Sequence, residues 1–211
     1  MISARRQLKT TPRKRPSQSR SKATVDTILA ATARILIKHG FDGLTTNAVA
    51  EAAGVSIGSL YQYFPNKQAL VAALIERRLD DKNAQTLSEL ARVAQLPLAE
   101  AVRTMISLTI ANYRESPALS RVLIEQVPRI GKMARIAELH HSTLTMVTAL
   151  LTARRHELAV RDPEMAAFVV VSAIEAIAQR AALFHPTRLE DPSLIDEATA
   201  MVTRYLGAAD G

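Results

Sequence analysis

Residues 44–67 have the sequence LTTNAVAEAAGVSIGSLYQYFPNK, which predicts two short helices joined by a tight turn. Thr45 or Thr46 can cap the first helix, and Gly54 can end it in a left-handed conformation. Ser56 can cap the second helix, and the later proline disfavours helical geometry in the residue before it, which ends this helix. Two short helices around a glycine-containing turn form a helix-turn-helix.

Several residues of this stretch have properties that suit a surface for DNA. A cap at Ser56 leaves amide groups in the first helical turn free for a phosphate or a base edge. Gly58 costs about 1 kcal/mol inside a helix relative to alanine, and close approach of the backbone to DNA would compensate for it. The hydroxyls of Tyr61 and Tyr63 can donate to phosphate oxygens. Lys67 begins the next helix, where a cation is unfavourable unless an anion such as a phosphate lies near.

Residues 23–75 resemble the DNA-binding domain of the tetracycline-repressor (TetR) family of transcriptional regulators. The segments TT, VAEAAGVS and LYQYFPNK match the family pattern almost position by position. The resemblance implies that Thr46, Tyr61 and Lys67 hold phosphates. It also implies a set of residues that face the major groove: Asn47, Ile57, Ser59, Gln62 and Tyr63. With Ser56 and Gly58 added, these are the predicted DNA-binding residues. A helical hairpin in a bundle core is the alternative interpretation, but it gives Gly58 no role.

The rest of the chain shows helical periodicity and no β-alternating run, so we expect an all-α fold of about nine helices. Outside the helix-turn-helix, the predicted helices cover about 25–39, a long segment after residue 66, 98–114, 118–127, 130–157, 163–184 and 192–206. Pro117 and Pro128 are expected to bound the segment 118–127. We predict a disordered basic arm at 1–22, a helix-turn-helix DNA-binding domain at 23–67 and an effector-binding and dimerisation domain at 68–211.

The net charge of +7 is concentrated at the N-terminus, because residues 1–22 hold eight Lys and Arg residues and no acid. A flexible basic arm beside a folded DNA-binding domain can contact DNA phosphates or enter the minor groove. A disordered terminus that only improves solubility is the alternative.

The family resemblance implies that the last two long helices pack against their copies in a second subunit. The apolar and small residues there agree with a homodimer, although burial within one chain would give the same pattern. The residues predicted for this interface are Phe168, Val171, Ser172, Glu175, Ala182, Met201, Val202 and Tyr205. A pseudopalindromic double-stranded operator has two half-sites and needs two DNA-binding domains, which favours the dimer.

An effector pocket is expected among the helices of residues 67–157, where polar groups lie near apolar faces. The candidates are Thr104, Thr109, Tyr113, Glu125, Gln126, His140 and Thr143. Residues of these types more often satisfy local backbone groups, so none is diagnostic alone. An unidentified small molecule is the expected ligand.

Other classes of function find little support in the sequence. The chain has no cysteine, and its five histidines have no helical i, i+4 pair, so we expect no metal site. Nucleophile-elbow, phosphate-loop and dinucleotide motifs are absent, so we expect neither an enzyme nor a cofactor. The longest apolar run, Met165–Ile174, is stopped by Glu175, so we expect no membrane span and a cytoplasmic protein. Three functions remain: a ligand-released repressor, a DNA-binding regulator without a small effector, and a non-specific nucleic-acid-binding protein led by the arm.

Overall fold

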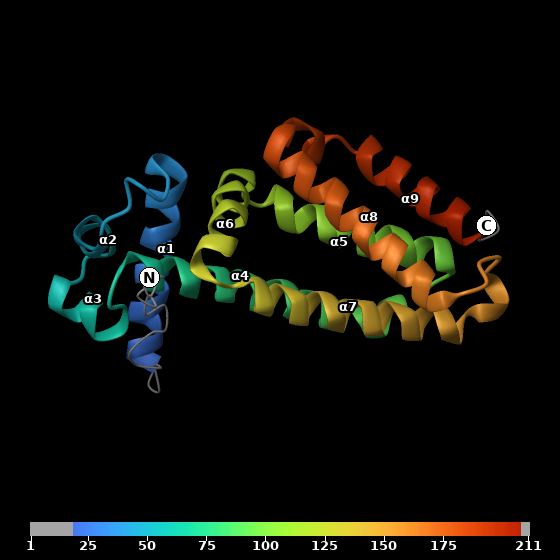
Figure 1. The fold of residues 1–211 in the computed structure, drawn as a ribbon, viewed down its shortest axis with the longest axis horizontal. Helices are drawn as coiled ribbons and strands as arrows, with labels where there is room; N and C mark the ends of the chain where they lie inside the picture. The colour runs from blue at the N-terminus through green and yellow to red at the C-terminus, as the bar shows by residue number, and fades with distance from the viewer. Residues whose placement is uncertain (1–18, 208–211) are drawn as a thin grey trace, which may run out of the picture. The chain divides into compact units, whose positions relative to one another are not determined.

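The computed structural model describes residues 19–207, and all regular structure in that range is helical (Figure 1). The helices are α1 (Ser19–His39), α2 (Thr46–Ala53), α3 (Ile57–Tyr63), α4 (Lys67–Val93), α5 (Leu98–Arg114), α6 (Pro117–Ile130), α7 (Met133–Ala153), η1 (Arg155–Glu157), α8 (Pro163–Phe184), η2 (Pro186–Glu190) and α9 (Ser193–Leu206). The predicted all-α fold is confirmed.

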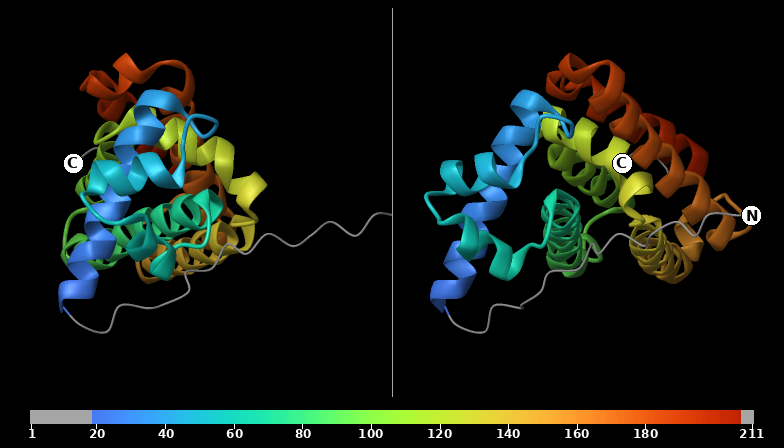
Figure 2. Two further views of the ribbon diagram at one scale, coloured as in Figure 1. Left: turned by 90° about the vertical axis from the view of Figure 1, so that its left-hand side faces the viewer. Right: turned by 60° about the vertical axis from the view of Figure 1, so that its left-hand side comes forward.

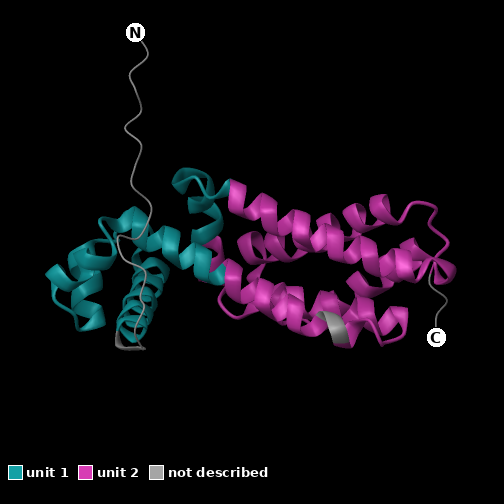
Figure 3. Ribbon diagram, turned by 90° about the horizontal axis from the view of Figure 1, so that it is seen from below, with its two compact units in different colours: residues 1–78, 122–133 teal, residues 79–121, 134–211 magenta. Residues whose placement is uncertain are grey.

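The chain divides into two compact units (Figure 3). Unit 1 comprises the described residues 19–78 and 122–133, and unit 2 comprises 79–121 and 134–207. The boundary expected at 67/68 assigned all of α4 to the larger domain, whereas the contacts assign its first three turns to unit 1. Those turns are buried on one side, and Arg77 in α4 pairs with Asp26 in α1 at 2.5 Å. The division of function between a DNA-binding domain at 23–67 and an effector-binding and dimerisation domain at 68–211 stays a prediction.

Two helix boundaries differ from the sequence-based expectation. Helix α1 begins at Ser19, so residues 19–22 of the predicted disordered arm are helical, because no proline or glycine interrupts the chain there. Residues 1–18 of that arm lie outside the described residues. Helix α6 continues through Pro128 to Ile130, so this proline does not bound it. Pro128 lies in the last turn, where it removes the hydrogen bond to the Ile124 carbonyl, and the helix ends only two residues later, before the chain turns at Gly131 with φ 74°.

Unit 1 has a small core beneath the helix-turn-helix. The side chains of Leu36, Leu44, Val49 and Leu60 are fully buried, and Phe64 is nearly so. The Arg34 guanidinium donates to the Ala52 carbonyl at 3.1 Å and ties α1 to the end of α2. Figure 2 shows α2 and α3 beside α1 in two further views. The core fixes the orientation of α3 and so determines which of its faces is exposed.

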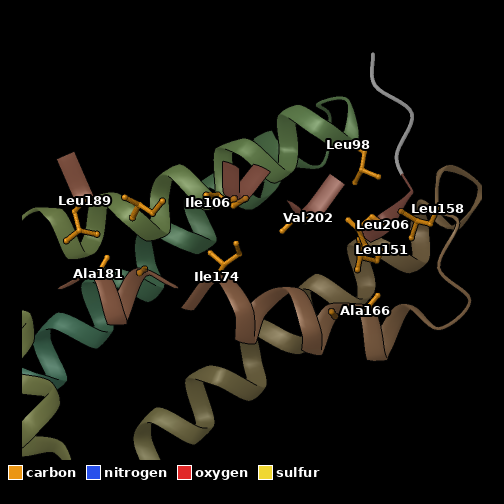
Figure 4. Packing of buried hydrophobic residues seen from close by; sticks show 14 of the residues in the cluster. Leu98, Ile106, Leu151, Leu158, Ala166, Ile174, Ala181, Leu189, Val202 and Leu206 are labelled. Carbon is orange, nitrogen blue, oxygen red and sulfur yellow. The ribbon is translucent and has the colours of Figure 1, made fainter. Parts of the chain in front are cut away.

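Unit 2 is built around α5, α8 and α9 (Figure 4). Its core cluster joins large aliphatic side chains of α5 and α9 to a row of buried alanines in α8: Ala166, Ala167, Ala178, Ala181 and Ala182. Because alanine is small, neighbouring helices can approach α8 closely on this side. The core of unit 2 therefore depends on small side chains as much as on large ones.

Helix α8 is the one described helix that is long and apolar enough to cross a membrane, with a window of mean hydropathy 1.6. Only 28% of that window is buried within the chain. Glu175 lies near its middle and pairs with Lys82 at 2.7 Å, and its alanine row packs into the core of unit 2. These contacts account for one side of α8, while its remaining apolar surface is uncovered.

Candidate nucleic-acid interface

The local sequence explains how α2 forms and where it ends. The Thr45 hydroxyl oxygen accepts a hydrogen bond from the Ala48 amide at 3.2 Å, so Thr45 and not Thr46 is the cap. Gly54 adopts φ 66° at the C-terminal end, and the Val55 amide donates to the Ala50 carbonyl at 3.0 Å. This tight turn delivers the chain directly to α3.

Helix α3 is capped by Ser56, whose hydroxyl oxygen accepts from the Ser59 amide at 3.1 Å. The two serine hydroxyls also share a hydrogen bond of 2.9 Å, so Ser59 is engaged in the cap. Leu60 and Phe64 occupy the buried face. The predicted two-helix arrangement, with Ser56 and Gly54 at its junction, is therefore present.

The opposite face of α3 is open to solvent. Ile57 and Tyr61 form one exposed row and have exposed fractions of 38% and 41%. Gly58 and Gln62 form a second exposed row beside it. A Cβ placed on Gly58 would meet only the Ser56 hydroxyl oxygen, at 3.9 Å. Among the described residues no neighbour therefore requires a glycine at this position, and the open space beside it permits an external approach.

An open depression of about 390 Å³ lies beside the start of α3 and α4. The residues predicted to hold phosphates, Thr46, Tyr61 and Lys67, all line it, and the Thr46 and Tyr61 hydroxyls share a hydrogen bond of 3.1 Å. Sequence reasoning missed its other lining residues: Asp42, Leu44, Thr45, Pro65, Asn66 and Gln68. Two hydroxyls and an ammonium at the N-terminus of a 27-residue helix favour an anion there, and the Asp42 carboxylate on the same lining opposes it.

Lys67 has a partner that sequence reasoning did not identify. Its ammonium donates to the Phe41 carbonyl at 3.1 Å and lies 4.6 Å from the centroid of the Phe41 ring. Contrary to the prediction, Lys67 does not need a DNA phosphate to offset the helix dipole, because the Phe41 carbonyl and ring stabilise its ammonium within the chain. No local signal could reveal a contact between residues 26 positions apart.

The remaining predicted contacts divide by exposure. Asn47, Ile57, Gly58 and Gln62 are exposed, as a DNA contact requires, whereas Ser59 and Tyr63 are half-buried. The Tyr63 ring lies 6.5 Å from that of Phe64. The exposed side chains of α3 and the depression beside it are therefore open to a ligand from outside the chain.

The family comparison agrees with this geometry. Residues 28–74 match the family described as bacterial regulatory proteins, tetR family, and residues 97–206 match the family described as tetracyclin repressor-like, C-terminal domain. The second match alone covers more than half of the chain. The chain belongs to the TetR family of transcriptional regulators.

Individual relatives show the same likeness. An HTH-type transcriptional regulator of Mycobacterium tuberculosis is 29% identical over 148 residues, which are 70% of this chain and 69% of that protein. The HTH-type transcriptional repressor KstR of Rhodococcus jostii is 34% identical over 114 residues, covering 50% of this chain and 53% of KstR. A solved TetR-family structure from Mesorhizobium loti matches with a TM-score of 0.70 and 20% identity, covering 89% of this chain and 98% of that one.

The candidates for an effector pocket in this TetR-family protein do not gather in one place. Glu125 and Gln126 belong to the part of α6 in unit 1, where Glu125 is exposed and Gln126 is buried. Thr109 and Thr143 donate to backbone carbonyls four residues earlier in their own helices, and Thr104 is half-buried in α5. Such local bonds are the ordinary use of threonine in a helix.

Two candidates, Tyr113 and His140, do approach one site in unit 2. The Tyr113 hydroxyl donates to the Glu175 carboxylate at 2.9 Å, and the Lys82 ammonium donates to the same oxygen at 2.7 Å. Burial raises the pKa of the Glu175 carboxyl, but Lys82, these hydrogen bonds and the charge of His140 outweigh it, so the pKa lies below its ordinary value. Burial and the Glu175 charge raise the pKa of Tyr113, which keeps its proton. We call Lys82, Tyr113, His140 and Glu175 the Glu175 cluster.

The residues predicted for the dimer interface of this TetR-family chain fall into three groups. Phe168, Met201 and Tyr205 are exposed, and Val171 and Ser172 are half-buried. Ala182 and Val202 belong instead to the core of the same protomer, because both are buried in the core cluster of unit 2. Glu175 bonds within its own chain. Helical periodicity identified apolar faces but could not tell which one packs inside unit 2.

In the described residues, no group of three or more acidic or histidine side chains is placed to hold a metal ion.

Proposed function

We propose that this chain is a homodimeric, sequence-specific repressor of transcription that acts in the cytoplasm, is not an enzyme and leaves its operator when a small molecule binds unit 2. The observation that carries the DNA-binding role is the uncovered face of α3 beside the depression containing Thr46, Tyr61 and Lys67. The name of KstR, a transcriptional repressor, supports the negative sign of regulation.

Phosphate contacts and base contacts have separate places on this surface. Thr46, Tyr61 and Lys67 bind a phosphate and so position the helix-turn-helix on the duplex, without distinguishing one base pair from another. The Gly58 and Gln62 row of α3 enters the major groove, where base edges present distinct patterns of donors and acceptors. Sequence preference therefore depends on α3, and overall affinity depends on the depression.

Dimerisation is supported by exposed apolar side chains on the last two helices: Met165, Phe168 and Val169 in α8, and Met201 and Tyr205 in α9. Apolar side chains concentrated on neighbouring helices mark an interaction surface. A second copy of the chain would cover these side chains and also supply the second helix-turn-helix that a pseudopalindromic operator requires.

Release by an effector is supported by the Glu175 cluster. An ion pair with a phenol, each group only partly exposed, offers charge and hydrogen bonds beside the apolar core of unit 2, and a few polar groups against apolar side chains are what a small molecule is bound by. To turn a bound population into a free one, the effector must prefer the released form by about 5.5 kcal/mol.

The test is selection of bound duplexes from random DNA with the purified full-length protein, followed by titration of the resulting complex with candidate small molecules. Enrichment of a pseudopalindrome and its release by one compound are expected. Enrichment without release by any compound would leave a regulator without a small effector. Equal affinity for all duplexes with steep salt dependence would instead indicate non-specific binding led by the basic arm.

A further inference from the structure

We infer that the base pairs read by α3 are A·T pairs, and that Gln62 is the residue that determines this specificity. The inference rests on the proposed function, because it concerns the operator to which the repressor binds. It follows from which side chains the exposed face of α3 presents and from which ones it lacks.

The helix-turn-helix has no arginine, the residue most suited to guanine. Residues 44–67 contain a single Lys or Arg, Lys67. Its ammonium is bound to the Phe41 carbonyl at 3.1 Å and lines the depression assigned to a phosphate. Guanine presents two acceptors in the major groove and is read by a bidentate Arg or Lys. The stretch therefore has no cation free to read a G·C pair in this way.

Gln62 is placed to read adenine. It is exposed and lies one turn after Gly58, whose missing Cβ lets this row of α3 come closest to a base edge. A glutamine amide has one acceptor and two donors, and adenine presents the matching N7 acceptor and N6 donor. Asn47 in the first turn of α2 is also exposed and carries the same amide group.

Ile57 adds a second preference in the same direction. It is the first residue of α3, and this apolar residue is 38% exposed. Thymine alone among the bases carries a methyl group in the major groove, and apolar side chains contact it. Adenine contact by Gln62 and thymine contact by Ile57 both favour A·T pairs.

The inference is tested on duplexes selected from random DNA by the full-length protein. We expect an A·T pair at the position whose preference Gln62→Ala abolishes, with a loss of about tenfold to a hundredfold in affinity when that pair becomes G·C. Replacing its adenine by 7-deazaadenine, which lacks the N7 acceptor, should weaken the wild type and leave Gln62→Ala unaffected. Replacing thymine by uracil should weaken the wild type more than Ile57→Ala. Gln85→Ala, an exposed glutamine of α4 in unit 2, is the matched control and should change nothing.

Two other outcomes separate the inference from the proposed function. Selected sites with G·C at the position that Gln62→Ala affects would overturn the inference and leave the sequence-specific repressor intact. Selected sites whose base preferences are the same for the wild type and Gln62→Ala would remove Gln62 as the reader. No enrichment of any sequence would overturn both.

Discussion

Replacing Gly58 by alanine should stabilise the protein and weaken its binding to DNA. Gly58 has no positive φ, and the new Cβ would meet only an ordinary van der Waals contact, at 3.9 Å from the Ser56 hydroxyl oxygen. The free energy of unfolding should therefore rise by about 1 kcal/mol, the helix-propensity difference between the two residues, and the melting temperature by about 2–4 °C. The methyl group extends about 1.5 Å from the helix surface, which is enough to break a base contact made through Gln62. Affinity for a selected operator should fall at least about tenfold.

The measurements are denaturant unfolding and operator titration of the same preparation. Gly54→Ala is the matched control, because Gly54 also has open space around it but holds φ 66°. Alanine there should destabilise the protein by about 1–2 kcal/mol. A Gly58→Ala protein that binds its operator as tightly as the wild type would refute the close approach of this row. A Gly58→Ala protein that is less stable than the wild type would refute the described environment of α3.

Further predictions concern charge, acid stability, packing and assembly. Lys67→Ala should weaken binding to every duplex alike and reduce the salt dependence by about one phosphate contact, as measured by titration at several salt concentrations. The folded-state pKa of Glu175 lies below the unfolded value, so its carboxylate contributes stability above pH about 4.3 that is lost as the pH falls through the folded-state pKa. Glu175→Gln should therefore lose less stability than the wild type between pH 7 and pH 3, measured by urea unfolding, and equal losses would contradict this. Arg154→Ala removes hydrogen bonds to two backbone carbonyls near the end of α4 and should cost about 2–3 kcal/mol in urea unfolding. Phe168→Asp should give a folded monomer by light scattering with circular dichroism, and a persistent dimer would exclude this face.

The sequence predicted the structural features that depend on contacts between residues close together in the chain. The caps at Thr45 and Ser56 and the turn at Gly54 each involve groups within four or five positions, so the helix-turn-helix could be read directly. The partner of Lys67 could not be read, because Phe41 reaches it only after two helices have formed.

The larger domain was harder to predict for a different physical reason. Helical spacing shows that α8 and α9 have apolar faces, but both the core and an interface need such faces. Ala182 and Val202 proved to be core residues, whereas Phe168 is exposed. Glu175 was expected at the interface, yet its charge is satisfied by Lys82, which is 93 positions away in the sequence.

Because of the buried alanines of α8, unit 2 should tolerate smaller side chains at these positions better than larger ones. Ala166, Ala167, Ala178 and Ala182 have no accessible surface, so truncation to glycine removes one methyl group, while any larger side chain must displace a neighbouring helix. Random mutation of this helix should therefore yield damaging enlargements far more often than damaging truncations. We therefore expect tolerated substitutions at these four positions to be confined to the smallest residues, whereas the exposed side of the same helix is limited instead by the proposed contact with a second copy.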